Sequence, residues 1–259
     1  MLANNNEAII NKLAKNSVKT NKKQYAILFF TIILSAFMLF CVFTIGMTYL
    51  NSSRLQNTRL NGAEYDIVTM NGFTSEQLNT LQQNENIRSV GIESYAGFIQ
   101  STEYDKTVEI GLLWCDEVFW DNLMSPARTK LDGHYPQNKN ELMVTKDILK
   151  TCGNENLSVG DSLILTYENN TGVYTDEFVI SGIWDGYGDT SAGFVSKAFY
   201  DETGYDLKNN GILCIKLNCN YVFPTTIQSI EKSLDFSDRQ IFAPTGYIEN
   251  SFKLLLGIC

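Results

Sequence analysis

The sequence contains a single histidine, His134, and lacks the short motifs that mark common enzymes. A hydrolase needs a nucleophile, a base and an orienting group that meet in space, and no G-x-S-x-G element is present to supply the first of these. No G-x-x-x-x-G-K-[ST] loop occurs either, so that familiar route to nucleotide hydrolysis is missing. We therefore expect a protein that is not an enzyme, with no catalytic residues and no cofactor.

His134 stands in the stretch Gly-His-Tyr-Pro, where the glycine and the proline favour a turn. This setting favours an exposed or structural role for the imidazole. An exported hydrolase that uses His134 as its base is the alternative, and replacing His134 with alanine separates the two.

Metal-binding patterns are also lacking. The six cysteines form no C-x-x-C pair, and one histidine is too few for a zinc set. Cys214 and Cys219 are close enough in the sequence to form a disulfide, while buried thiols are the ordinary alternative. Asp185 and Asp189 lie among glycines in residues 184–193, but the calcium-loop pattern fails at Tyr187. We read this stretch as a flexible connector and predict no metal site.

Net charge is −9, and it is unevenly distributed. Residues 1–23 hold five lysines against Glu7, which gives +4, so the remainder of the chain carries −13. A body this acidic repels phosphate backbones, so nucleic acid is excluded as an expected partner.

An uncharged apolar run covers residues 25–50. As a helix it would be roughly 39 Å long, enough to cross a hydrocarbon core of about 30 Å with some tilt. A buried core helix is seldom apolar on every face, and a cleaved signal peptide has a shorter run and a small-residue cleavage site. We therefore expect a retained transmembrane helix at residues 25–50, with the lipid bilayer as a partner and a polar connector after it.

The segment before the run, residues 1–24, predicts a basic amphipathic helix. At about 100° per residue its apolar side chains occupy one face and its lysines the opposite face. The apolar set is Ile9, Ile10, Leu13, Ala14 and Val18, and the basic set is Lys12, Lys15, Lys19, Lys22 and Lys23. We expect these lysines to contact the inner membrane surface or a cytoplasmic partner, the alternative being a solvated charge run.

The same lysines predict orientation. Five precede the apolar run, whereas only Arg54 and Arg59 follow it closely. The positive-inside rule therefore places the N-terminus in the cytoplasm of a bacterial cell and residues after about 50 outside its membrane.

Residues 51–245 predict an extracytoplasmic α+β domain. Residues 63–73, 87–100 and 106–114 have strand character, and residues 73–87 form a helix for which Thr74 and Gln77 have capping-box spacing. A similar unit recurs near the end, with strands in 192–200, 210–218 and 239–245. Its helix, residues 225–236, repeats the capping spacing at Thr225 and Gln228. Two such units predict a split α/β layer whose sheet is covered by helices.

Between these units, at about residues 130–190, lies a small all-β insertion. Residues 140–147 form a strand, and residues 162–167 and 176–184 form a hairpin around a loose loop at 168–172. Trp114, Phe119 and Trp120 cluster just before the insertion. We favour a core position for these aromatics over an apolar ligand or partner surface.

Residues 246–259 turn apolar again, as expected for the start of a second transmembrane helix that is cut short at Cys259.

The order of these features resembles the FtsX-like/MacB-like ABC transporter permeases over nearly the whole chain. A glycine, a proline and a glutamate lead into the apolar strand 142–144, a Leu-x-x-Gly-Asp element follows at 157–161, and a strand ending in Gly-Ile follows at 178–183. The residues that carry the resemblance are Gly133, Pro136, Glu141, Gly160, Asp161 and Gly182.

The resemblance implies a MacB-like core domain and a permease that couples ATP hydrolysis by a cytoplasmic ABC ATPase subunit to movement outside the membrane. It further implies a homodimer or a paired permease, with amphiphilic peptides or lipids as substrates or signalling as the output. His134 would then be a scaffold residue. Family members have further spans and a cytoplasmic coupling element after this domain, so the chain is expected to be a truncated or partial permease. A single-span, membrane-anchored ligand-binding or sensor protein, which needs no further span, is the alternative.

Overall fold

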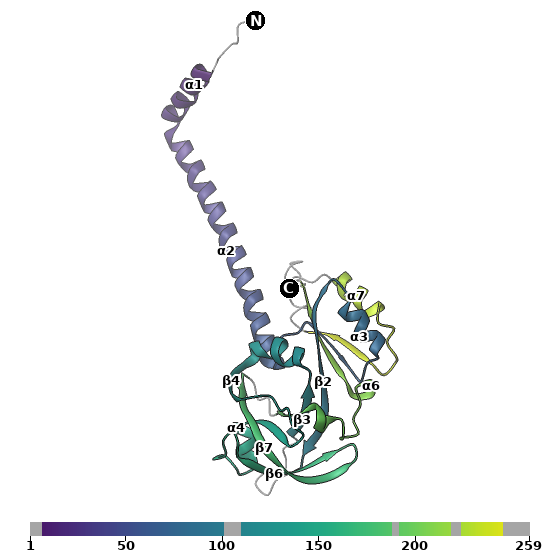
Figure 1. Cartoon of the computed structure of the whole chain (residues 1–259). Coiled ribbons are helices and arrows are strands. Elements are labelled where there is room, and N and C mark those ends of the chain that lie inside the picture. The colour runs from purple at the N-terminus through teal and green to yellow at the C-terminus, as the bar shows by residue number, and fades with distance from the viewer. Residues whose placement is uncertain (1–6, 101–109, 188–191, 219–223, 246–259) are drawn as a thin grey trace. The chain divides into compact units, whose positions relative to one another are not determined.

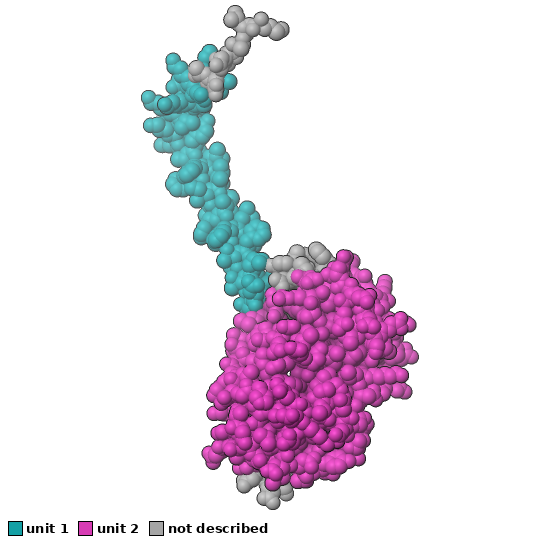
Figure 2. All heavy atoms as spheres, viewed as in Figure 1, with its two compact units in different colours: residues 1–52 teal, residues 53–259 magenta. Residues whose placement is uncertain are grey.

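A computed structural model describes residues 7–100, 110–187, 192–218 and 224–245 (Figure 1). The chain divides into two compact units, residues 1–52 and residues 53–259 (Figure 2). The second transmembrane helix expected at residues 246–259 lies outside the described residues, as do Cys219 and Cys259.

Two helices begin the chain. Helix α1 (Glu7–Thr20) ends before a bend at Asn21, and α2 (Lys22–Asn61) follows with 40 residues. Within the described part of the chain, α2 alone is long and apolar enough to cross a membrane. The polar connector expected after residue 50 is wrong, because α2 continues without a break to Asn61. Residues 51–61 lack glycine before their end and lack proline, and several of them are good helix formers.

The α+β prediction is confirmed. Ten strands among the described residues form one mixed sheet in the order β10-β1-β9-β2-β3-β8-β5-β7-β4, and β6 pairs with both β2 and β7. The strands are β1 (Ile67–Met70), β2 (Ile87–Ile99), β3 (Ile110–Cys115), β4 (Arg128–Gly133), β5 (Glu141–Thr145), β6 (Ser162–Asn169), β7 (Gly172–Gly186), β8 (Ala192–Val195), β9 (Ile212–Leu217) and β10 (Ile241–Pro244). The helices of this unit are α3 (Ser75–Gln82), the π-helix η1 (Val118–Leu123), the 3₁₀-helix η2 (Ser125–Ala127), α4 (Lys146–Thr151), α5 (Lys197–Tyr200), α6 (Leu207–Asn210) and α7 (Pro224–Lys232).

Helices α3 and α7 cover the part of the sheet built from β1, β9 and β2 (Figure 1). Leu81 of α3 and Ile230 of α7 are fully buried against strand residues such as Ile215. The predicted capping box is confirmed, since the Thr74 hydroxyl accepts from the Gln77 amide and the Gln77 side chain accepts from the Thr74 amide. Thr225 lies inside α7, so the second capping box is wrong.

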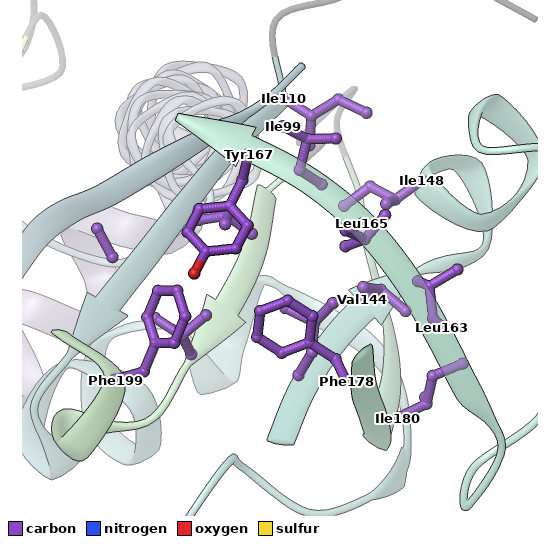
Figure 3. Close-up of a cluster of buried hydrophobic side chains, with 14 of the residues drawn as sticks. Ile99, Ile110, Val144, Ile148, Leu163, Leu165, Tyr167, Phe178, Ile180 and Phe199 are labelled. Atoms are coloured by element: carbon purple, nitrogen blue, oxygen red, sulfur yellow. The ribbon is translucent and has the colours of Figure 1, made fainter. Parts of the chain in front are cut away.

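A second apolar core lies under β3, β5, β6 and β7 (Figure 3). Phe178, Phe199 and Tyr167 contact one another there, with ring centroids 5.3–5.8 Å apart. The predicted β6–β7 hairpin is confirmed, but its loop is tight rather than loose. Asn169 pairs directly with Gly172, and the Asn169 side chain accepts hydrogen bonds from the amides of Thr171 and Gly172.

A third core lies on the opposite face of the central strands. Neighbouring residues along a strand point to opposite faces, and Leu112 belongs to the second core while Leu113 packs on the third. Helix η1 covers this face with Phe119 and Trp120, whereas Trp114 lies in the second core. All three aromatic side chains are buried, which confirms the core prediction for them.

The connector expected at residues 184–193 is wrong in its first part. Trp184, Asp185 and Gly186 form the end of β7 and pair with β4. Residues 188–191, which include Asp189, lie outside the described residues.

Candidate functional site

The five lysines singled out in the sequence fall on two helices. Lys12, Lys15 and Lys19 are exposed on α1, whereas Lys22 and Lys23 begin α2 beyond the bend at Asn21. The apolar side chains of α1 are exposed as well, by 47–64% for Ile9, Ile10, Leu13 and Val18. In the described part of the chain nothing covers this apolar face, as a helix lying on a lipid surface requires.

The six motif residues of the exported unit converge on four residues of β7, numbers 179–182. Gly133 pairs with Gly182 across β4 and β7, and Glu141 pairs with Val179 across β5 and β7. The Gly160 amide donates to the carbonyl of Ile180 at 2.8 Å, and the Ile180 amide donates to the carbonyl of Asp161 at 2.9 Å. We call residues 179–182 and the backbone bound to them the β7 hub.

Steric limits explain the glycines at the β7 hub. Gly133 has φ +88°, and a Cβ there would lie 2.2 Å from the carbonyl oxygen of Ser181. A Cβ on Gly182 would lie 2.8 Å from the carbonyl oxygen of His134. The two strands therefore approach each other too closely for any side chain.

The acidic residues of the motif hold turns. Glu141 Oε2 accepts from the amides of Gln137 and Asn138 at 2.7 and 3.1 Å. Partial burial opposes ionisation of Glu141, but these hydrogen bonds hold its pKa below the ordinary 4.5. Asp161 Oδ2 accepts from the Ser158 amide at 2.8 Å. Both residues act on the chain's own backbone rather than facing a cavity.

The Gly-His-Tyr-Pro stretch is anchored by Tyr135, which the sequence analysis did not single out. The Tyr135 hydroxyl accepts from the Cys115 amide at 3.0 Å and lies within 3.3 Å of the Cys115 and Val195 carbonyls. Pro136 is buried, while His134 is exposed and its Nδ1 lies 3.0 Å from the Tyr135 carbonyl. The structure thus places His134 on a surface turn, and no hydroxyl or thiol nucleophile is hydrogen-bonded to it among the described residues.

An ion-pair network, also not anticipated, joins the end of α2 to the sheet. Arg54 of α2 pairs with Glu64, and Lys216 of β9 lies 3.4 Å from Glu64 and 3.1 Å from Asp66. Burial raises the pKa of Glu64, but Arg54 and Lys216 outweigh it and hold that pKa below 4.5. Asp66 also accepts from the amide of Leu217 at 2.9 Å. We call these four charged residues the α2–β9 network.

The last turns of α2 make further contacts within the exported unit. Thr58 is buried, and the guanidinium of Arg59 stacks over the Tyr187 ring at 4.1 Å. A polar cavity of about 380 Å³ opens beside the network, lined by Glu64, Lys216 and Arg88 among others. Residues 53–61 are therefore fastened to the sheet by a buried polar contact, a cation–π contact and ion pairs.

One carboxyl group on the third core lacks a partner. Glu93 of β2 is partly buried and forms no hydrogen bond or ion pair within the described residues, and burial raises its pKa to about 7. Burial likewise raises the pKa of the thiols of Cys115 and Cys214 and of the phenols of Tyr65 and Tyr135, and the charge of Glu93 adds to each of these shifts.

Metal-ligating groups do not converge in the described part of the chain, where no three His, Cys, Asp or Glu side chains gather. Asp185 is exposed and accepts a hydrogen bond from the next residue's amide. Cys115, Cys152 and Cys214 are buried free thiols, and the partner considered for Cys214, Cys219, lies outside the described residues.

No family model matches the chain, and no curated protein sequence matches it. Solved structures do match at low identity. The periplasmic region of MacB from Actinobacillus actinomycetemcomitans is 12% identical with a TM-score of 0.48, over 74% of this chain and 95% of that one. A domain of a permease protein from Porphyromonas gingivalis is 9% identical with a TM-score of 0.43, over 70% and 89%. The extracellular domain of the noncanonic ABC-type transporter YknZ from Gram-positive bacteria is 13% identical with a TM-score of 0.44, over 69% and 98%. The sequence motifs and these comparisons thus name the same group of proteins.

Proposed function

We propose that the chain is all or part of a permease subunit of an ABC transporter in a bacterial cell membrane. Its lysine-bearing N-terminus lies in the cytoplasm, α2 spans the bilayer and the α+β unit lies outside. The observation that carries this proposal is the β7 hub. Six residues chosen from the sequence for their resemblance to one permease family meet there, in a chain that also carries an apolar 40-residue helix.

The permease acts by moving its exported unit when a cytoplasmic ABC ATPase subunit binds and hydrolyses ATP. Helix α2 runs from the lysines to Asn61 without a break, and a helix is stiff along its axis. Its last turns are fastened to β9 through Arg54, Glu64 and Lys216. A shift or rotation of α2 is therefore passed to the sheet through the α2–β9 network.

The output is export or release of amphiphilic peptides or lipids, or a signal passed across the membrane, and the active form is a homodimer or a paired permease. The chain lacks a nucleotide-binding loop of the familiar kind, so the ATPase comes from a partner.

Co-purification tests the proposal. The full chain is expressed in its own membrane with each ABC ATPase encoded beside its gene, and the detergent-extracted complex is assayed for bound ATPase and for ATP turnover. We expect one ATPase to co-purify. Recovery of the chain without any ATPase would contradict the proposal.

Charge reversal tests the coupling step. In the complex, Arg54→Glu breaks the pair with Glu64 and is expected to reduce transport or signalling while the ATPase stays bound. Adding Glu64→Arg restores a pair of opposite charges and should recover part of the activity. Arg88→Glu, at a residue with no ion pair among the described residues, is the matched control.

A single-span, membrane-anchored binding or sensor protein is the second candidate, and a polar cavity beside α3 favours it. Such a protein needs no ATPase, so the co-purification experiment separates the two functions.

A further inference from the structure

The largest cavity bordered by described residues, about 440 Å³, lies at the end of the sheet that α3 and α7 cover. The turn between β1 and α3, the short helix α6 and the segment between α7 and β10 form its walls (Figure 1). Its volume falls within the range of roughly 300–1,000 Å³ that small-molecule sites occupy.

The floor of the cavity is fixed by two glutamines. Gln77 donates to the carbonyl of Leu234 at 2.9 Å, and Gln240 donates to the carbonyl of Gly72 at 2.8 Å. The two side-chain amides also bond to each other at 2.9 and 3.1 Å. Three segments far apart in the sequence are therefore held together, and the cavity exists before any ligand arrives.

The backbone at its rim is unusual. Asn71 and Asp235 have φ of +67° and +43°, and they are the two non-glycine residues with positive φ in the described part of the chain. Both line this cavity, and the Asn71 side chain donates to the carbonyl of Arg239 at 2.8 Å. Backbone strain of this kind concentrates at binding sites, where the surrounding structure maintains it.

The charges around the cavity are of both signs. Glu76 and Asp235 are acidic, Lys208 and Arg239 are basic, and all four are exposed. Within the described residues none of them takes part in an ion pair, although two cations and two anions line the same space. They are thus free to pair with a ligand.

Apolar lining is scarce. Leu234 is the single aliphatic side chain among the lining residues, and no aromatic side chain lines the cavity. Amphiphiles need apolar surface for their tails, and sites that hold sugars or flat rings usually offer an aromatic face. The lining instead offers amides, hydroxyls and charges of both signs, which match a peptide backbone flanked by charged side chains.

We propose that this cavity binds a short hydrophilic peptide segment that carries both an acidic and a basic side chain. The ligand's basic group pairs with Asp235 and Glu76, and its acidic group pairs with Arg239 and Lys208. This inference stands apart from the ATPase partner of the proposed function, so peptide binding and ATPase co-purification fail or succeed separately.

Calorimetry on the full chain in detergent micelles tests the site with end-blocked tripeptides. The probes are acetyl-Lys-Gly-Glu-amide and acetyl-Glu-Gly-Lys-amide, and acetyl-Gln-Gly-Gln-amide is the neutral comparison. Asp235→Asn removes a charge while keeping a residue that tolerates positive φ, and Arg239→Gln removes the opposite charge. Asp238→Asn and Lys232→Gln are matched controls at exposed residues that do not line the cavity.

We expect saturable binding of at least one mixed-charge tripeptide, with no binding of the neutral one. Each cavity variant should weaken binding by roughly tenfold or more, because a charge-assisted hydrogen bond is lost, and the controls should bind like the parent. Three results overturn the inference: no mixed-charge peptide binds, the neutral peptide binds as tightly, or the cavity variants and their controls bind alike. Unchanged urea denaturation of each variant shows that it is folded.

Discussion

The ammonium group of Lys216 lies 3.1 Å from Oδ2 of Asp66, and only 7% of each side chain is exposed. Removing two charges from water is costly, and the cost is offset only where geometry and extra hydrogen bonds are good. Glu64 and the Leu217 amide supply such contacts here. The relationship fixes the start of β1 and the end of β9 together, at the place where α2 ends.

Asp66→Asn should therefore destabilise the exported unit strongly. It leaves Lys216 buried with a weakened set of acceptors while conserving shape and the acceptor for Leu217. We expect the free energy of unfolding to fall by about 3 kcal/mol or more. Urea denaturation of the full chain in micelles, followed by tryptophan fluorescence, measures the change.

The exposed pair of Lys139 and Glu202 is the comparison, with side chains 57% and 62% exposed. Glu202→Gln should lower the free energy of unfolding by less than about 1 kcal/mol, since water screens that pair. Equal losses at Asp66 and Glu202 would show that burial of Lys216 contributes nothing.

Gly133→Ala tests the β7 hub. A methyl group at this position would lie 2.2 Å from the Ser181 carbonyl oxygen, and φ is +88°. The variant therefore carries both conformational strain and a clash with backbone, and we expect a loss of about 3 kcal/mol or more in the free energy of unfolding. The same urea denaturation measures it.

Gly160→Ala separates the two contributions. Its φ is +95°, but nothing lies within 4 Å of an added Cβ. Strain alone should cost about 1–2 kcal/mol. If Gly160→Ala and Gly133→Ala are equally destabilised, the close approach of β4 to β7 is not what requires the glycine.

Local patterns in the sequence carried much of the fold. The capping box at Thr74 depends on residues three apart, and the hairpin of β6 and β7 depends on alternation around a turn, so both could be read directly. The six motif residues could also be chosen in advance. Their meeting at β7 depends on strand pairing between distant segments, which no local pattern encodes.

The α2–β9 network could not be read from the sequence for the same reason. Asp66 and Lys216 are 150 residues apart, and either one alone is an ordinary charged residue. Tyr135 was overlooked because attention fell on the neighbouring His134, although an aromatic residue next to a fixed turn is a common anchor. The helix after residue 50 was missed because asparagine and serine suggested a connector, while the contacts of Thr58 and Arg59 favour the helix.

Stability should depend on pH through Glu93. Burial among the third-core residues raises its pKa from the ordinary 4.5 to about 7. Between these values the folded chain binds more protons than the unfolded chain, so the free energy of unfolding falls as pH rises, and the contribution levels off above about 7. The groups that face Glu93 and share its field are Tyr65, Cys115, Tyr135 and Cys214.

Glu93→Gln should remove this part of the pH dependence, since glutamine does not titrate. Melting temperatures of the parent and the variant at pH 5, 6 and 7 make the measurement. The parent should lose stability relative to the variant as pH rises across this window. Glu177→Gln, at an exposed position of β7, serves as the control, and a variant that keeps the parent's pH slope would remove Glu93 as its source.

Orientation in the membrane should depend on the N-terminal lysines. Replacing all five with glutamine changes the charge of residues 1–23 from +4 to −1, because Glu7 remains, while Arg54 and Arg59 still follow the span. The positive-inside rule then favours the opposite orientation, so a fraction of the chains should keep the exported unit in the cytoplasm. Protease added to spheroplasts, compared with lysed cells, measures the protected fraction. Glutamine at five exposed lysines of the exported unit, Lys130, Lys139, Lys146, Lys150 and Lys232, gives the same charge change far from the span and should leave the parent's full digestion in intact spheroplasts. Full digestion of the N-terminal variant in intact spheroplasts would show that these lysines do not set the orientation.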